Sequence, residues 1–136
     1  MQKQLGLFAG PRQRGRRLPP PKEFALHCAI ADLVTRWIMP GWQFTHIPLG
    51  EHRNKATAAR LKRMGVKPGW PDFIFVGPHR VFFLELKRRG EDQSDEQANV
   101  ALHLMRCGFT YLCTDNLDDA IATLRDLGIV RAVVSA

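Results

Sequence analysis

The sequence predicts an α/β fold in which helices flank a central mixed β-sheet in three layers. Two apolar runs rich in aromatic and β-branched residues, 73–76 and 81–84, are separated by Gly77-Pro78-His79-Arg80, which is typical of a hairpin. The rest of the chain alternates between segments with helical periodicity and short apolar strands. This alternation is typical of a sheet that is covered by helices.

The predicted elements follow the order helix, strand, helix, hairpin, helix, strand, helix. Helices are predicted over residues 22–38 and 55–64, from the capping-box sequence 94–97 to Gly108, and from Asp115 or Asn116 to Gly128; single strands are predicted over 42–47 and 109–114, and the hairpin over 72–87. Ala101, Leu104 and Met105 are expected on the buried side of their helix. Residues 129–134 are expected to add an edge strand or a partner contact.

The predicted hairpin brings two carboxylates and an ammonium group onto one patch. If Val76 pairs with Val81, Asp72 lies opposite Glu85, and Lys87 projects from the same side because side chains alternate between faces. Two carboxylates about 4 Å apart repel by several kcal/mol at an effective dielectric of roughly 20. A divalent cation with oxygen ligands would offset that repulsion. An ordinary surface ion pair is the alternative, but charges beside such apolar runs are uncommon without a partner or a metal.

The uneven distribution of charge suggests a polyanion as the partner, and a solvated surface that only keeps the protein soluble is the alternative. The 136 residues carry 20 basic and 13 acidic side chains, and their net charge is +7. Residues 1–21, rich in Gly, Pro and Arg, are predicted to be a disordered basic arm ahead of a single domain over 22–136.

No apolar run approaches the roughly 18 residues of a membrane span. Three cysteines without a CxxC pair suit a reducing cytosol.

Three motifs together resemble the VRR-NUC domain (virus-type replication-repair nuclease) of the PD-(D/E)XK nuclease superfamily, in its small stand-alone form. They are Gly65-Val66-Lys67-Pro68-Gly69-Trp70-Pro71-Asp72, Glu85-Leu86-Lys87 and Asp92-Gln93-Ser94-Asp95-Glu96-Gln97, and the likeness spans roughly residues 22–127. The resemblance implies a restriction-endonuclease-like three-layer sandwich and a phage or bacterial origin, with the protein in the cytoplasm of the bacterial or phage-infected cell. Trp70 stands where a smaller apolar residue is expected.

The resemblance also implies a metal centre for hydrolysis. Asp72 and Glu85 would bind Mg²⁺ or Mn²⁺ together with the backbone carbonyl of Leu86, and Lys87 would be the catalytic lysine. Glu23 would complete the acidic cluster as a further ligand.

Two of the residues implied as catalytic have a structural alternative. Glu23 would equally stabilise the N-terminus of its helix. Gln97 would support Lys87 or the scissile phosphate, but it is also the third residue of a capping box and would then bind the backbone of Ser94.

Other polar residues are assigned to DNA or to packing. The basic residues expected to contact DNA phosphates are Arg53, Lys55, Arg60, Lys62, Arg63, Lys67, Arg88 and Arg89. His46, His52 and Asn54 loosely resemble the residues of a histidine-metal nuclease, but the strand-helix-metal context of such a site is missing. His27, one turn after Glu23, is expected to pack inside or lie on the surface rather than approach the site.

The N-terminal arm contains a second motif. Gln4-Leu5-Gly6-Leu7-Phe8 resembles the peptide with which bacterial replication proteins dock onto the sliding clamp. Leu5, Leu7 and Phe8 have no core to enter; Leu7 and Phe8 would fill an apolar pocket, and Gln4 would fix the direction of the peptide. A strand or helical turn packed on the domain is the alternative.

These observations predict a metal-dependent DNA endonuclease that hydrolyses phosphodiester bonds. The resemblance implies branched DNA, such as a four-way junction in replication, repair or recombination, cut by a homodimer. Flaps, ends or plain duplex are alternative substrates. The other alternative is a non-catalytic DNA- or clamp-binding module on the same fold, against which the presence of Asp72, Glu85 and Lys87 argues.

Overall fold

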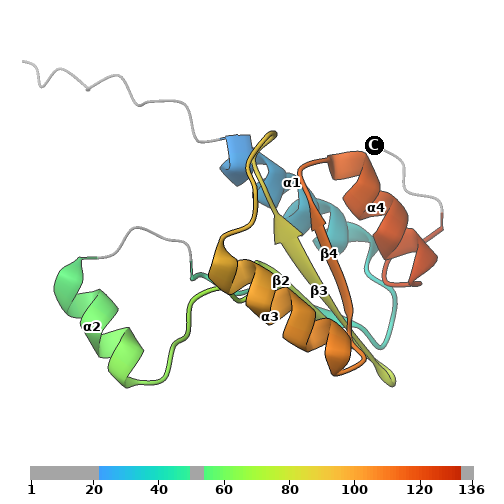
Figure 1. The fold of residues 1–136 in the computed structure, drawn as a ribbon. Coiled ribbons are helices and arrows are strands. Elements are labelled where there is room, and N and C mark those ends of the chain that lie inside the picture. The colour runs from blue at the N-terminus through green and yellow to red at the C-terminus, as the bar shows by residue number, and fades with distance from the viewer. Residues whose placement is uncertain (1–21, 50–53, 133–136) are drawn as a thin grey trace, which may run out of the picture.

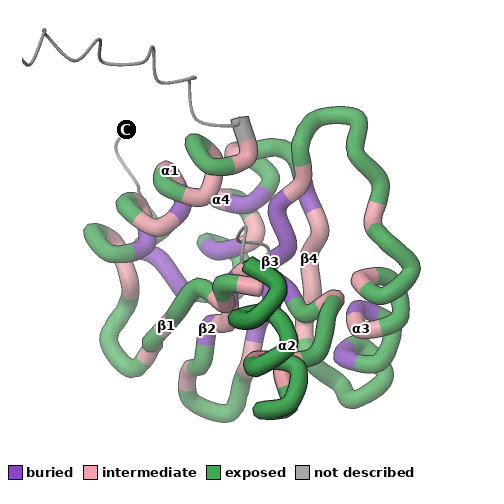
Figure 2. The backbone as a smooth tube through the Cα atoms, turned by 90° about the vertical axis from the view of Figure 1, so that its left-hand side faces the viewer, coloured by how far each residue is buried: buried purple, intermediate pink, exposed green. Residues whose placement is uncertain are grey.

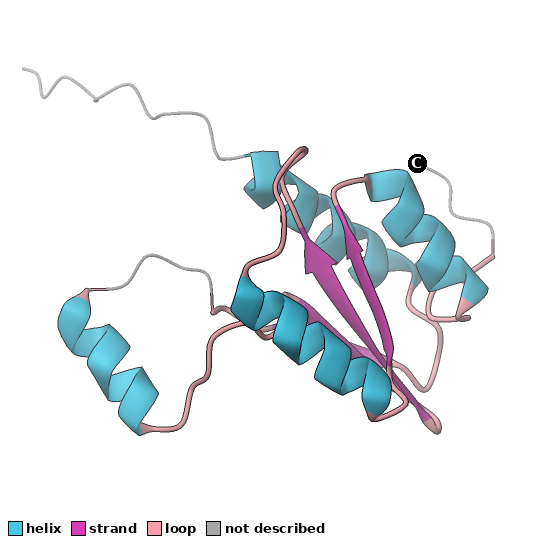
Figure 3. Cartoon of the chain, in the orientation of Figure 1, coloured by secondary structure: helices cyan, strands magenta, loops and turns pink. Residues whose placement is uncertain are grey.

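The protein is described here by a computed structural model that covers residues 22–49 and 54–132 (Figure 1). Its elements, coloured by type in Figure 3, are α1 (Lys22–Trp37), β1 (Gln43–His46), α2 (Lys55–Arg63), β2 (Phe73–Gly77), β3 (Arg80–Leu86), α3 (Asp95–Arg106), β4 (Thr110–Thr114) and α4 (Leu117–Asp126). Their order is the predicted one. Within these ranges, no helix is long and apolar enough to cross a bilayer. The predicted arm over residues 1–21 lies outside the described residues.

The four strands form one mixed sheet in the order β1-β2-β3-β4. β2 is antiparallel to both β1 and β3, whereas β4 runs parallel to β3. Val76 pairs with Val81 and Phe73 with Leu84, so the hairpin has the predicted register. The prediction of an α/β fold around a central mixed sheet is confirmed.

Helices cover both faces of the sheet (Figure 1). One face packs against α1 and α4 and forms the main core, whose buried members are Ile30, Val34, Phe73, Phe75, Phe82, Leu84, Leu86, Ala120, Leu124, Ile129 and Val130. Residues of β3 that alternate with these, Phe83 and Glu85, point to the other face, which α3 covers. Figure 2 shows buried positions concentrated in the strands and on the facing sides of the helices. Glu85 is therefore buried between the sheet and α3, at the end of a strand.

Two details of packing differ from the sequence prediction. Met105 is half exposed, because α3 turns Ala101 and Leu104 toward the sheet instead. Of the two expectations for residues 129–134, an edge strand is not formed by 129–132, the described part of that segment, while a partner contact stays a prediction. Ile129 and Val130 are buried in the core, and Val130 forms only an isolated bridge with Ile38.

α2 projects from the side of the molecule (Figure 1). It contains no buried residue, and Asn54 caps its N-terminus with a side chain that accepts a hydrogen bond of 2.8 Å from the amide of Thr57. Its last turn carries three basic side chains and no acid precedes them in its first turn. A helix with this composition and exposure is suited to a polyanion rather than to the core.

Gly69 holds the loop before the hairpin against the start of α3. Its φ is +89°, and a Cβ atom there would lie 2.5 Å from the carbonyl oxygen of Glu96 and 3.0 Å from the amide nitrogen of Gln97. Gly65 is a matched control, because its φ is +101° but no atom would lie within 4 Å of its Cβ.

We expect Gly69→Ala to destabilise the protein more than Gly65→Ala. Both variants pay for a left-handed backbone, about 1 kcal/mol. Only Gly69→Ala also forces backbone atoms apart, at a further cost of about 1–3 kcal/mol. Denaturant unfolding of both variants measures the difference. Equal losses of unfolding free energy would show that the close approach to α3 is unimportant.

Candidate active site

The predicted carboxylate patch lies where the hairpin strands end. Asp72 immediately precedes β2, and its Oδ2 accepts a hydrogen bond of 2.7 Å from the amide of Leu86. The last paired residues of β2 and β3 at this end are Phe73 and Leu84. Beyond them, the side-chain carboxylate of Asp72 accepts the hydrogen bond that a backbone carbonyl accepts within the sheet. The backbone carbonyl of Asp72 accepts a hydrogen bond of 2.6 Å from the amide of Ile47. Asp72 is therefore held from both neighbouring strands.

Glu85 is a buried carboxylate in an unfavourable environment. Only 3% of the residue is exposed. Burial, and secondarily the negative charge of Asp72, raise the pKa of Glu85 from 4.5 to about 8, and Glu23 acts in the same direction. Lys87 acts in the opposite direction but does not offset these effects. Three carboxylates therefore influence one another here, and a bound proton or cation would relieve their repulsion.

The side chain of Gln97 joins the capping box of α3 to the ionic residues. Its Oε1 accepts hydrogen bonds from the amide of Ser94 (2.9 Å) and from Nζ of Lys87 (2.5 Å). Its Nε2 donates to Oε1 of Glu85 at 3.0 Å. The sequence suggested that Gln97 either caps the helix or supports Lys87. The two roles are not exclusive, because one side-chain amide caps the helix and orients both Lys87 and Glu85.

α1 contributes two residues at the edge of the patch. Glu23 lies in its first turn, and Oε1 of Glu23 is 3.8 Å from Nε2 of His27. The same Nε2 is 3.6 Å from Oδ2 of Asp72, while the imidazole packs against Phe73 with ring centroids 5.4 Å apart. The sequence favoured packing or a surface position for His27 over an approach to the site, and the ring does pack against Phe73. Its packing and its approach to Asp72 occur together.

His46 is a site residue that sequence reasoning missed. It pairs with Phe73 across β1 and β2, and its Nδ1 lies 2.7 Å from the backbone carbonyl oxygen of Asp72. The signal that would have revealed it is the register between β1 and β2.

Tyr111 and Cys113 of β4 share the face of Glu85, and sequence reasoning missed both. Cys113 pairs with Glu85, and the hydroxyl of Tyr111 accepts a hydrogen bond of 2.6 Å from Nε2 of Gln93. Burial raises the pKa of the Tyr111 hydroxyl and, with Glu85 as the second cause, that of the Cys113 thiol. Both groups therefore line the site in their neutral forms.

The backbone of Leu86 contacts Asp72 through its amide group.

The predicted DNA contacts that lie within the described residues are all exposed, and none of them forms an ion pair with a described carboxylate. They are Lys55, Arg60, Lys62, Arg63, Lys67, Arg88 and Arg89. Arg53 and the predicted clamp peptide, Gln4-Leu5-Gly6-Leu7-Phe8, lie outside the described residues.

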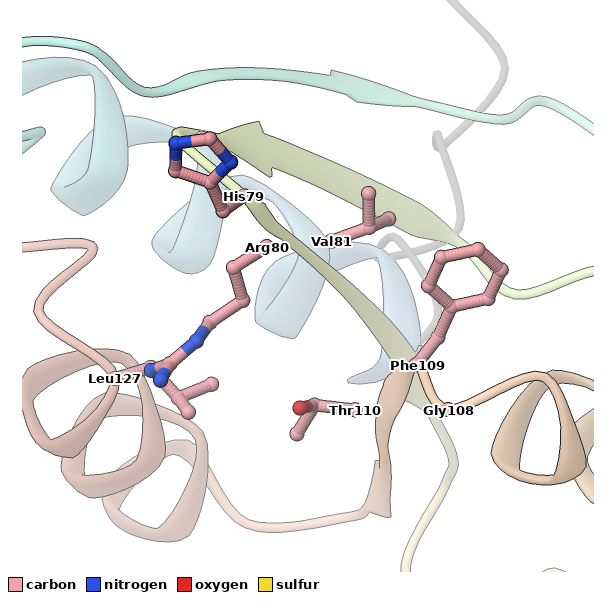
Figure 4. A pocket seen from close by; sticks show the side chains of 8 residues that line it. His79, Arg80, Val81, Gly108, Phe109, Thr110 and Leu127 are labelled. Atoms are coloured by element: carbon pink, nitrogen blue, oxygen red, sulfur yellow. The ribbon is translucent and has the colours of Figure 1, made fainter.

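A cavity of about 590 Å³ lies elsewhere, at the other end of β3. His79, Arg80, Val81 and Phe109 are among the residues that line it (Figure 4). Glu85 is five residues further along the strand, roughly 16 Å away. The cavity is thus separate from the carboxylate patch.

Comparison with known proteins identifies the fold. No family model matches the sequence, and no curated protein does. A solved structure described as a VRR_NUC domain protein superimposes with a TM-score of 0.65 over 88% of this chain and 100% of its own, at 22% sequence identity. The chain has the VRR-NUC fold. In this chain the patch lies at the end of the central hairpin, close to Glu23 of α1 and Gln97 of α3.

Proposed function

We propose that the protein is a Mg²⁺- or Mn²⁺-dependent DNA endonuclease that hydrolyses phosphodiester bonds. The observation that carries this proposal is the geometry at the end of the hairpin: the carboxylate of Glu85 is buried, and that of Asp72 accepts a hydrogen bond from the amide of the next residue, Leu86. Burial and the charges of Asp72 and Glu23 raise the pKa of Glu85 to about 8, which agrees with this arrangement. These carboxylates are an oxygen donor set of the kind that hard divalent cations bind. The likeness to a VRR_NUC domain protein supports the same chemistry.

Asp72 and Glu85 would hold the cation, with Glu23 as a further ligand and the Leu86 carbonyl as the backbone ligand. When bound, such a cation supplies a Lewis acid that polarises a phosphoryl oxygen and makes water more acidic. The protein's own residues would then bind the phosphate, keep it aligned and stabilise its developing charge.

Lys87 is suited to stabilise negative charge on the phosphate. Its ammonium group has three N–H donors, of which one is directed at Gln97, and it lies 3.9 Å from Oε1 of Glu85. The remaining donors are available to a phosphoryl oxygen or to the attacking water. Because Gln97 fixes the amine before substrate arrives, little reorganisation is needed during the reaction.

Gln97→Ala and Ser94→Ala separate the catalytic role of the amide from its capping role. Both variants break the capping box and should cost about 1 kcal/mol of unfolding free energy. Only Gln97→Ala also releases Lys87 and Glu85, so we expect kcat to fall about tenfold or more in that variant alone. Unfolding curves and single-turnover cleavage measure the two effects. Similar kcat values for the two variants would restrict Gln97 to capping.

The exposed basic residues would guide DNA to the metal centre. We expect Arg63→Glu on α2 to weaken binding to all DNA sequences and to reduce the salt dependence of the binding constant by about one phosphate contact. Arg125→Glu on α4 is a matched control, because α4 lies away from α2 (Figure 1). Equal effects of both changes would contradict a specific role for α2.

Branched DNA is the substrate that the resemblance favours, and a homodimer would place two active sites on opposed strands. Incubating the purified protein with labelled four-way junction, flap and linear duplex, with Mg²⁺ or with EDTA, tests both the activity and the preference. Cleavage only with metal is expected, fastest on the junction. Tight binding without cleavage would indicate the non-catalytic module, and light scattering tests the dimer.

The N-terminal peptide would recruit a sliding clamp to the protein. Loss of clamp binding in a variant with Leu7→Ala and Phe8→Ala would support this role. Unchanged binding would eliminate it.

A further inference from the structure

A group of nitrogen donors lies beside the carboxylates proposed to bind Mg²⁺. His27 on α1, His46 on β1 and Asp72 before β2 each offer one ligand atom, and these three atoms lie within 4.8 Å of one another. The proposed hydrolysis uses Asp72 but neither histidine. The two imidazoles therefore need a separate explanation.

The hydrogen bond of His46 leaves one of its nitrogens ready to bind a metal. Nδ1 of His46 is 2.7 Å from the backbone carbonyl oxygen of Asp72. A carbonyl oxygen only accepts hydrogen bonds, so Nδ1 carries the proton and Nε2 keeps its lone pair in the neutral ring. Metal-binding histidines generally have this arrangement, in which the other ring nitrogen donates to a carbonyl or carboxylate.

The spacing around His27 also fits an ion. Nε2 of His27 is 3.6 Å from Oδ2 of Asp72 and 3.8 Å from Oε1 of Glu23, too long for hydrogen bonds. Ligand atoms that lie 2.0–2.1 Å from one ion are roughly 3–4 Å apart. An ion between these atoms therefore requires only small side-chain movements.

The two imidazoles are held in place by packing. Their ring centroids are 5.1 Å apart at an interplanar angle of 84°, an edge-to-face contact. Each ring also packs against Phe73, with centroids 5.4 Å apart in both cases. Because a core residue fixes both rings, the donors are largely preorganised.

We propose that His27, His46 and Asp72 form a second cation site, which takes a first-row transition metal of the Zn²⁺ class. Imidazole nitrogens favour such metals, whereas Mg²⁺ prefers oxygen ligands. Two imidazoles, one carboxylate and an open position resemble the ligand set of catalytic zinc sites. The site adjoins the proposed nuclease centre by sharing Asp72, but its existence does not depend on DNA cleavage.

The test is Zn²⁺ affinity, measured on the metal-free full-length protein by competition with a chromophoric chelator. His27→Phe and His46→Phe keep an aromatic ring against Phe73 but remove the ligand, so each should weaken Zn²⁺ binding at least about tenfold. His103→Phe is the control, because Nε2 of His103 on α3 and Sγ of Cys107, which caps that helix, lie 3.6 Å apart and are another pair of possible Zn²⁺ donors. Unchanged affinity in the first two variants, or loss only in the third, would overturn the proposal.

Two further measurements separate this site from misfolding and from the nuclease centre. In the wild-type protein, Zn²⁺ should shift the ¹⁵N signals of both His27 and His46, and the absence of shifts would overturn the proposal without any variant. Glu85→Gln should abolish thermal stabilisation by Mg²⁺ but leave Zn²⁺ binding within about threefold. Loss of Zn²⁺ binding in this variant would overturn the assignment to His27, His46 and Asp72.

Discussion

Asp72→Asn and Glu85→Gln should each lower the rate of metal-dependent DNA cleavage by at least about a thousandfold. Either change removes a negative charge from the pair of carboxylates that would hold the cation, and the buried position of Glu85 leaves no nearby solvent to take its place. Loss of a metal-based Lewis acid costs several kcal/mol of transition-state stabilisation. Single-turnover cleavage at saturating Mg²⁺ measures the effect.

The control for this prediction is an exposed carboxylate near the same helix. Glu96 lies in the first turn of α3, beside Gln97, but its side chain is exposed. Glu96→Gln should keep cleavage within about threefold of the wild type. If Asp72→Asn or Glu85→Gln cleaves as fast as Glu96→Gln, the assigned chemistry is wrong.

The stability of the metal-free protein should fall as the pH rises from about 5 to about 8. The pKa of Glu85 is 4.5 before folding and about 8 in the folded protein, so between these values the folded state holds a proton that the unfolded state has lost. The resulting stabilisation is complete below pH 4.5 and is lost as the pH passes through 8. Denaturant unfolding in EDTA across this range measures the slope.

Glu85→Gln should remove most of this pH dependence and make the metal-free protein more stable at pH 8. The amide has no charge to bury, so we expect a gain of at least about 1 kcal/mol, equivalent to a few degrees in Tm. Mg²⁺ should raise the stability of the wild type but not that of Glu85→Gln. The gain should increase with pH, because the ion has to displace the proton of Glu85 when it binds. An unchanged slope in Glu85→Gln would show that another group is responsible.

The sequence was most informative where contacts are local. The hairpin register followed from the apolar runs and the four-residue turn, and with it the proximity of Asp72 and Glu85. The burial of Glu85 followed from its apolar neighbours in β3. For Gln97, a local pattern indicated the capping box, while only the packing of α3 on the sheet showed that the same amide reaches Lys87.

Contacts between distant segments were not predictable in this way. His46 is 26 residues from Asp72, and their contact depends on the register of β1, a four-residue strand with no clear alternation of buried and exposed positions. Helical spacing places His27 on the same side of α1 as Glu23. Which element this side of α1 faces depends on how α1 packs against core residues from α4 and the strands.

The most direct test of the central claim is to locate the cation by anomalous diffraction from crystals grown with Mn²⁺. The account predicts a peak about 2–2.5 Å from carboxylate oxygens of both Asp72 and Glu85. A further peak between His27 and His46 is compatible with this result. Carboxylates of Asp72 and Glu85 that bind no common ion at saturating Mn²⁺ would contradict the proposed nuclease centre.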